Sequence, residues 1–243
     1  MYQDAHLHLQ RGEDFEKLQL PTGAGRFFIN TASYSDFETL KDAALSDRVF
    51  PFYGIHPWFA DGCKLSYSTL SDTISGLNAT GVGESGLDFS GKYKKSREVQ
   101  IRVFEYQVKI AAELGLPLSV HCVGACEQLF KSFDRCGPPA RPFILHSFYG
   151  SAEILQRLLK LGAYISLSEL SLKNPEKSFQ VISQIPPGRM LIESDLAAGA
   201  PGVTATGYLE RLENTYDTAA SILKMDNGEF EQRIWENGTV FTN

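Results

Sequence analysis

The sequence predicts an α/β fold, a (β/α)₈ (TIM) barrel that spans residues 1–243 as one domain. Short apolar runs rich in β-branched and aromatic side chains alternate about eight times with longer segments of helical periodicity. A chain of 243 residues has the length at which such barrels commonly form a single core. An open, doubly wound sheet is the alternative, but no GxGxxG motif follows the first strand.

The first strand is predicted from the segment DAHLHL, which alternates polar and apolar residues. This alternation places Asp4, His6 and His8 on one face, where two imidazoles can converge on one cation; the alternative is an edge strand with a solvated polar face. Residues 10–25 are expected to form an irregular loop that distorts the barrel. In chain order, the predicted strands are residues 4–9, 26–32, 49–55, 81–87, 116–122, 141–148, 163–168 and 189–195.

The clearest helix is predicted over residues 96–114, where Ser96 is expected as the N-cap and Gly115 as the C-terminal stop. Its apolar side chains recur at helical spacing along one stripe: Val99, Val103, Tyr106, Ile110 and Leu114. A second helix over residues 151–161 is expected to end at Gly162 in the same way.

Composition narrows the classes of function. The net charge of -6 argues against a sequence-independent nucleic-acid coat, although an enzyme can still meet phosphate through bound metal. No apolar run approaches the roughly 18 residues that would span a membrane. The cysteines Cys63, Cys122, Cys126 and Cys136 form no CxxC pair and are expected to be reduced thiols of a cytoplasmic protein, for which a monomer is favoured.

Histidines and carboxylates gather at the predicted carboxyl ends of the strands, which is where barrel enzymes place their active sites. Any one of these histidines alone would more simply be a hydrogen-bonded core imidazole, but all five histidines of the chain share this placement. The expected site contains His6, His8, His56, Glu84, His121, His146 and Asp195.

Four imidazoles and two carboxylates suffice to bind two divalent metal ions, with Glu84 as the natural bridge between them. Such a centre stays net positive, generates hydroxide at neutral pH and attracts an anionic substrate. The mixed nitrogen and oxygen donors suit Zn, Mn or Fe better than an all-oxygen Mg or Ca site. The expected cofactors are therefore two divalent ions, with Zn, Mn and Mg as the candidates.

The chain resembles the TatD family of metal-dependent deoxyribonucleases, which lies within the amidohydrolase-like barrels. The resemblance extends from end to end and rests on motifs in the family's order. These are DxHxH, GIHP, GESGLDF, a Gln-rich helix leading into LPLSVH, HSFYGS, LIESD and WENGTVF.

The resemblance implies a role for each candidate residue. His6 and His8 would hold the first metal together with Asp195, and Glu84 would bridge to a second metal. That second metal would be held by His121 and His146. Asp195 would also act as general base toward the attacking water. His56, in GIHP, would contact substrate; the alternative is that it satisfies loop carbonyls.

Strand alternation suggests two supporting residues. Asp4 shares a predicted face with His6 and is expected to accept the free ring N–H, which would fix its tautomer. Glu193 lies one pleat deeper than Asp195 and should find a partner, because a lone buried carboxylate is costly.

The chain departs from the family pattern on the substrate side. The family usually places a polar, often Arg-containing stretch after the fifth-strand histidine, where this chain has Cys122-Val123-Gly124-Ala125. A small-residue segment also precedes Pro201. Replacements are expected on other loops: a basic turn to hold a nucleic-acid backbone and two aromatics to stack a base. They are Lys92, Lys94, Lys95 and Arg97, with Trp58 and Tyr149; the alternative is a solvated turn with ordinary loop aromatics.

The leading functional prediction is a metal-dependent hydrolase that cleaves phosphodiesters of DNA. Its exonuclease character is implied by the family alone. A small-molecule amidohydrolase, esterase or lactonase with the same centre is the alternative, and an inert barrel scaffold is a third possibility.

Overall fold

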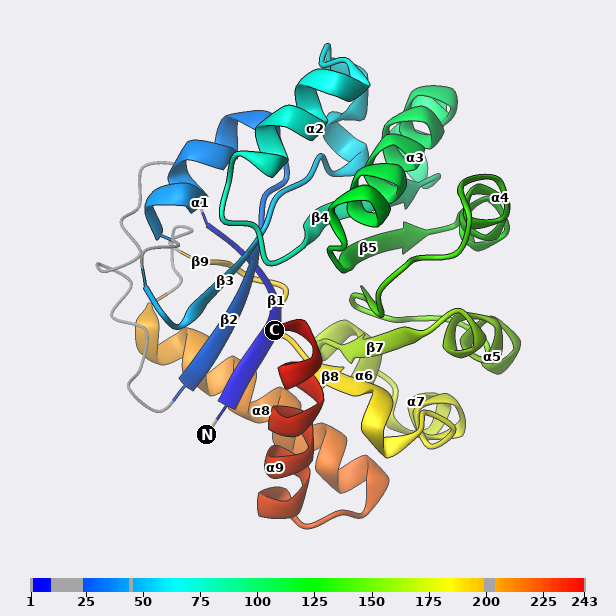
Figure 1. Ribbon diagram of the computed structural model, residues 1–243. Helices are drawn as coiled ribbons and strands as arrows, with labels where there is room; N and C mark the ends of the chain where they lie inside the picture. Colours follow the sequence, from blue (N-terminus) through cyan, green and yellow to red (C-terminus); the bar gives the residue numbers. More distant parts are fainter. Residues whose placement is uncertain (1, 10–23, 44–45, 199–203, 243) are drawn as a thin grey trace.

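The computed structural model describes residues 2–9, 24–43, 46–198 and 204–242 (Figure 1). Its strands form two parallel sheets, with orders β3-β2-β1-β9 and β4-β5-β6-β7-β8. The strands are β1 Tyr2–Leu9, β2 Ala24–Asn30, β3 Val49–Phe52, β4 Val82–Asp88, β5 Leu118–Val123, β6 Phe143–Leu145, β7 Ala163–Leu167, β8 Met190–Ile192 and β9 Ala197–Ala198.

The two sheets join at both edges and close the barrel. Between β3 and β4, the Tyr53 amide donates to the Gly81 carbonyl at 3.1 Å. Between β8 and β1, the Asp195 amide donates to the His6 carbonyl at 3.0 Å, and the His8 amide donates to the Leu196 carbonyl at 2.9 Å. Strands β1 to β8 therefore follow one another around the barrel in chain order, which confirms the predicted (β/α)₈ barrel.

Helices surround the strands, as Figure 1 shows, and the chain ends near the middle of that view, close to β1. They cover the outward faces of the strands and bury the main apolar core between the two layers. The helices are α1 Phe37–Ala43, α2 Tyr67–Ser75, α3 Arg97–Leu114, α4 Cys126–Cys136, α5 Ala152–Lys160, α6 Glu169–Leu172, α7 Pro175–Ile182, α8 Ala205–Leu223 and α9 Asn227–Gly238, with 3₁₀ turns η2 Tyr34–Asp36, η3 Pro57–Gly62, η4 Gly91–Ser96, η5 Pro187–Arg189 and η6 Thr239–Phe241.

Each predicted strand range contains a strand, but the ends differ. The ranges 141–148 and 189–195 shrink to β6 and β8, because Ser147 and Asp195 adopt positive φ angles of 44° and 52° and leave the ladder. The expected loop over residues 10–25 lies outside the described residues up to residue 23. Its last two residues belong to β2, where Ala24 pairs with Tyr2.

The helix caps confirm most of the predicted boundaries. Gly115 ends α3 with a φ of 66°, and Gly162, with a φ of 91°, follows the end of α5. Ser96 precedes α3, but its side chain makes no capping hydrogen bond. It donates instead to the Tyr93 carbonyl at 3.0 Å, because the chain enters α3 directly from η4.

The barrel interior contains an apolar layer and a polar layer. A separate apolar cluster is formed by Ala5, Phe28, Phe52, Ile144, Tyr164, Leu191 and Phe241. Two residues further along the same strands or just beyond their ends, and hence on the same inner face, polar side chains replace apolar ones. These buried polar residues include Asn30, His146, Ser166 and Glu193.

Candidate metal centre

The polar layer brings together all six predicted ligands at the carboxyl ends of the strands. They come from five different strands or the turns that follow them. His6 and His8 lie on β1, Glu84 on β4 and His121 on β5, whereas His146 and Asp195 lie just beyond β6 and β8.

Glu84 lies at the middle of this cluster, and its two carboxylate oxygens face different imidazoles. Oε2 lies 3.3 Å from Nε2 of His6 and 3.0 Å from Nε2 of His8. Oε1 lies 2.9 Å from Nδ1 of His121 and 3.0 Å from Nε2 of His146. Each oxygen therefore faces one pair of the predicted ligand imidazoles, which is the arrangement that a bridging carboxylate requires.

A bulge in β4 helps to bring Glu84 into the barrel. The pairing of β4 with β5 shifts register between Val82 and Ser85, so that one extra residue is inserted there. Gly83 lies in this bulge, where a Cβ atom would approach the Ser119 Cβ to 2.7 Å. The close packing against β5 therefore requires glycine at this position.

Hydrogen-bond acceptors and donors around the cluster orient the imidazole rings. Nδ1 of His8 donates to the Asn30 carbonyl at 2.9 Å, which leaves its Nε2 lone pair directed at the centre. Nδ1 of His146 lies 3.2 Å from Oε1 of Glu193, and Nδ1 of His6 lies 3.1 Å from the Ser119 hydroxyl. The nitrogens left facing the centre are those that a metal ion would need.

Asp195 is the most exposed member of the cluster, with 38% of its side chain accessible. One ligand atom each from His6, His8 and Asp195 fall within 4.8 Å of one another. The left-handed backbone at Asp195 is uncommon for a residue with a side chain, and such conformations concentrate at functional sites.

The described part of the chain leaves several buried polar atoms of this cluster without a hydrogen bond. Oε1 of Glu84 lies close to three imidazoles, yet none of them donates to it in acceptable geometry, and Nε2 of His121 and Oε2 of Glu193 are also unpartnered. Buried polar atoms are nearly always satisfied in proteins. Unsatisfied nitrogen and oxygen atoms within one cluster of imidazoles and carboxylates fit a site for divalent cations.

The charges of the cluster also shift pKa values. Burial alone would raise the pKa of Glu84, but the charges of His56, His146 and His6 hold it well below its ordinary value. Burial opposes protonation of His146, yet the charges of Glu84 and Glu193 raise its pKa well above the ordinary value. For His6, burial prevails and lowers the pKa. The Glu84 carboxylate is therefore ionised, as a metal ligand must be.

His56 is a fifth imidazole within the cluster. It is buried, and its Nε2 lies 3.3 Å from Oε1 of Glu84. Its Nδ1 accepts a hydrogen bond from the Trp58 amide at 3.1 Å. Within the described ranges its ring makes no hydrogen bond to a loop carbonyl but satisfies a loop amide, so contact with substrate stays a prediction and the structural alternative stays open.

The predicted contact between Asp4 and the His6 ring is wrong. The β1–β2 pairing shifts register between Asp4 and Leu7, which interrupts the alternation on which the prediction depended. The Asp4 carboxylate instead accepts from the Tyr208 hydroxyl at 2.6 Å and from the Ser194 amide at 3.0 Å. Burial raises the pKa of Asp4 to about 7, against the opposing effect of these donors.

Glu193 has the partners that its burial demanded. Its Oε1 accepts from the Ser147 amide at 2.7 Å and lies beside the His146 ring.

Sequence reasoning missed Asp88, whose Oδ2 lies 3.6 Å from Nε2 of His121. The signal was present, because Asp88 follows Glu84 by four residues on the same strand.

Among the predicted substrate-binding residues, His56 lies within the cluster and Trp58 packs against the His56 ring, whereas the others are exposed. The Trp58 ring stacks on Tyr93 with centroids 4.8 Å apart, and its Nε1 donates to Asp88 at 2.6 Å. Tyr93 therefore covers one face that was predicted to stack a base. Tyr149 is 70% exposed. The side chains of the basic turn, Lys92, Lys94, Lys95 and Arg97, are all exposed.

A closed parallel barrel with imidazoles and carboxylates at the carboxyl ends of its strands defines the class of TIM-barrel metal-dependent hydrolases. The model of the family described as TatD related DNase matches residues 3–242, and the chain belongs to this family.

Individual relatives agree with this assignment. A Bacillus subtilis protein described as an uncharacterized metal-dependent hydrolase, YabD, is 30% identical over 151 residues, which are 61% of this chain and 59% of that protein. The Salmonella typhimurium 3'-5' ssDNA/RNA exonuclease TatD is 28% identical over 176 residues, covering 70% of this chain and 66% of that protein. These matches thus span less than two thirds of the length of either relative.

A solved structure shows the same fold. The TatD homologue YJJV from Escherichia coli superposes with a TM-score of 0.85 over 99% of this chain and 97% of that chain, at 21% sequence identity.

No helix in the described ranges is long and apolar enough to cross a membrane.

Proposed function

We propose that the chain is a metal-dependent phosphodiesterase that shortens single-stranded nucleic acid, DNA above all, from one end. The observation that carries this proposal is the position of Glu84, whose two oxygens face separate imidazoles. Family membership and the name of the Salmonella exonuclease support nucleic acid as the substrate.

The proposed centre would hold two divalent cations, with Zn, Mn or Mg as the candidate metals. His6, His8 and Asp195 would hold one ion, His121 and His146 would hold the other, and Glu84 would contribute to both. Such a pair supplies Lewis-acid stabilisation of the charge that develops on a phosphodiester and activates water for attack.

The remaining catalytic, orienting and substrate-binding roles belong to residues of the chain itself. Asp195 has a partly exposed carboxylate beside His6 and His8, where it can accept a proton from the attacking water. Glu193 and the Asn30 carbonyl hold His146 and His8 in the orientation that directs Nε2 inward. His56 lies beside Glu84 at the same mouth and contacts the substrate.

The four cysteines are free thiols in the structure, in keeping with the reducing conditions of the cytoplasm, where we place the protein.

The test is cleavage of end-labelled single-stranded DNA in the presence of Mg²⁺, Mn²⁺ or Zn²⁺, with chelated protein as the blank. We expect the wild type to shorten the strand in at least one metal and His6→Ala to lose at least about 100-fold of that rate, since a ligand is removed. Equal rates for the two proteins would reject the site assignment.

A panel of carboxylic esters, lactones and amides run beside the DNA tests the other candidate chemistry. The acidic net charge and the absence of arginine from residues 122–125 favour that candidate. Hydrolysis of one of these compounds without any cleavage of DNA would replace the phosphodiesterase with a small-molecule hydrolase on the same centre.

A further inference from the structure

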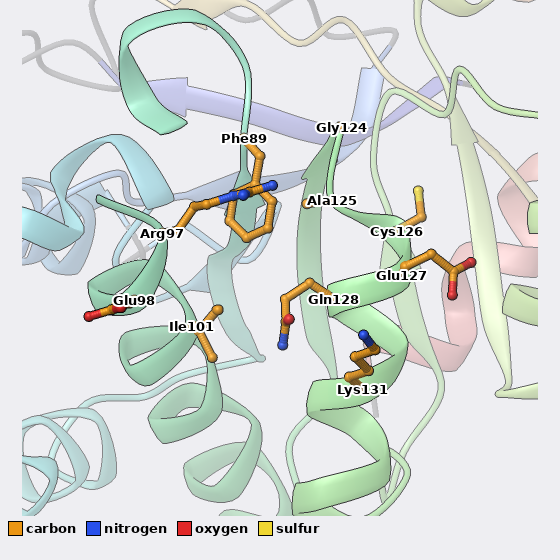
Figure 2. A pocket seen from close by; sticks show the side chains of 10 residues that line it. All are labelled: Phe89, Arg97, Glu98, Ile101, Gly124, Ala125, Cys126, Glu127, Gln128 and Lys131. Atoms are coloured by element: carbon orange, nitrogen blue, oxygen red, sulfur yellow. The ribbon is translucent and has the colours of Figure 1, made fainter. Parts of the chain in front are cut away.

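A cavity of about 610 Å³ lies between α3 and α4, on the outer side of β4 and β5 (Figure 2). Its walls are mostly apolar, with a few charged or amide side chains at the rim. Its lining includes Phe89, Arg97, Ile101, Cys126, Gln128 and Lys131.

The cavity adjoins the metal centre along the ends of β4 and β5. Phe89 follows Asp88, whose carboxylate lies 3.6 Å from His121. The Phe89 amide donates to the Val123 carbonyl at 2.9 Å, so the two walls of the cavity are joined directly above the strands that carry Glu84 and His121. The cavity therefore borders the carboxyl ends of the two strands that carry Glu84 and His121.

Two cationic side chains line the cavity. In the described part of the chain, neither Arg97 nor Lys131 forms an ion pair. The acid on the same rim, Glu127, is bound by Arg157, and Figure 2 shows the Glu98 side chain directed away from α4. The charge is therefore complementary to an anionic ligand.

The cavity also offers a flat surface and an unused donor. The Arg97 guanidinium lies over the Phe89 ring, 4.4 Å from its centroid, as Figure 2 shows. Nucleic-acid bases stack on aromatic rings and on guanidinium planes. Nε2 of Gln128 is buried and has no hydrogen-bond partner in the described ranges, and its side chain projects toward α3. An amide donor in that place suits a base carbonyl.

We propose that the α3–α4 cavity is a nucleotide subsite for single-stranded nucleic acid, and this inference rests on the proposed function. A base of the strand stacks on the Arg97–Phe89 pair and accepts from Gln128, while Lys131 contacts a backbone phosphate. The cavity thus provides cationic side chains, Arg97 and Lys131, which residues 122–125 lack.

Fluorescence anisotropy with labelled oligothymidylates of two to twelve nucleotides, in chelator, tests the subsite without cleavage. Arg97→Glu and Lys131→Glu should each weaken binding of the longest strand about tenfold. Arg102→Glu and Lys109→Glu make the same charge changes at exposed positions of α3 and should stay within about twofold of wild type. The slope of log K against log salt should fall by about 0.7 for Lys131→Glu and remain unchanged for both controls.

A second measurement uses the wild-type chain alone. Cys126 lines the cavity, whereas Cys63 and Cys136 do not. The twelve-nucleotide strand should slow alkylation of Cys126 by N-ethylmaleimide at least fivefold, as read by peptide mass spectrometry, and leave Cys63 and Cys136 unchanged. This readout does not depend on whether a variant folds.

The outcomes separate the two proposals. Equal affinities for the cavity variants and their controls, with Cys126 unprotected, would overturn the subsite. Wild-type cleavage of DNA in the metal-supplemented assay would leave the phosphodiesterase intact in that case. A wild type that neither binds nor cleaves any strand would overturn both proposals.

Discussion

The two layers inside the barrel are built on the same strands and obey opposite rules. The apolar layer around Phe28 and Ile144 is fully buried and packs side chain against side chain. The polar layer that follows it contains Glu84 and Glu193, equally buried, with oxygen atoms that no hydrogen bond satisfies. The first layer therefore supplies stability, whereas the proposed metal site would satisfy the unpartnered oxygens of the second.

Among the substitutions that test the difference between the two layers, Glu84→Gln should have the largest effect on activity. The substitution keeps the size of the side chain but removes the charge that faces both imidazole pairs, so activity should fall by about 1,000-fold. Cleavage rate and metal content by mass spectrometry measure the change, with Glu176→Gln on the exposed face of α7 as the control. Retained metal and rate in Glu84→Gln would show that the two layers do not differ in this way.

Removal of metal from the wild type should lower the melting temperature by about 5–10 °C. A ligand at 100 times its Kd stabilises the native state by about 2.7 kcal/mol, and about 1 kcal/mol corresponds to 2–4 °C in a chain of this size. Differential scanning calorimetry with metal and with chelator measures the shift. An identical melting temperature in both conditions would mean that the polar layer needs no ion.

Glu193→Gln should weaken metal binding by about 10- to 100-fold, because the carboxylate that orients His146 loses its charge. Competition against a chromophoric chelator gives the affinity. We expect one of the two metal-binding steps to change more than the other, since Glu193 contacts only one side of the cluster. Unchanged affinity would remove Glu193 from the support of the site.

The smallest effect is expected in the apolar layer, from Ile144→Val. Loss of one buried methylene should cost about 0.5–1.5 kcal/mol of unfolding free energy, with the cleavage rate per folded molecule within about twofold of wild type. Urea unfolding and the DNA assay report the two quantities separately. A large loss of rate without a loss of stability would show that the layers are coupled.

Much of this architecture could be predicted from the sequence, because strand periodicity and barrel topology place distant residues at one mouth. His6, Glu84, His121 and Asp195 meet where parallel strands must end, whatever the details of the loops. The orientation of Asp4 could not be predicted, since a bulge in β1 breaks the alternation that the sequence pattern assumes.

Features that depend on helix packing were also invisible in the sequence. Gln128 and Lys131 are unremarkable residues of α4 until that helix is placed beside α3. Ser119 has no motif to mark it, yet its hydroxyl contacts the His6 ring. Such roles arise from tertiary distances, which local patterns do not encode.

The metal content of chelator-stripped protein after saturation with Zn²⁺ or Mn²⁺ tests the proposed two-ion site most directly. We expect about two ions per chain for the wild type, and about one each for His8→Ala and His121→Ala, which remove ligands from opposite sides of Glu84. A wild type that retains no more metal than either variant would contradict the two-ion site.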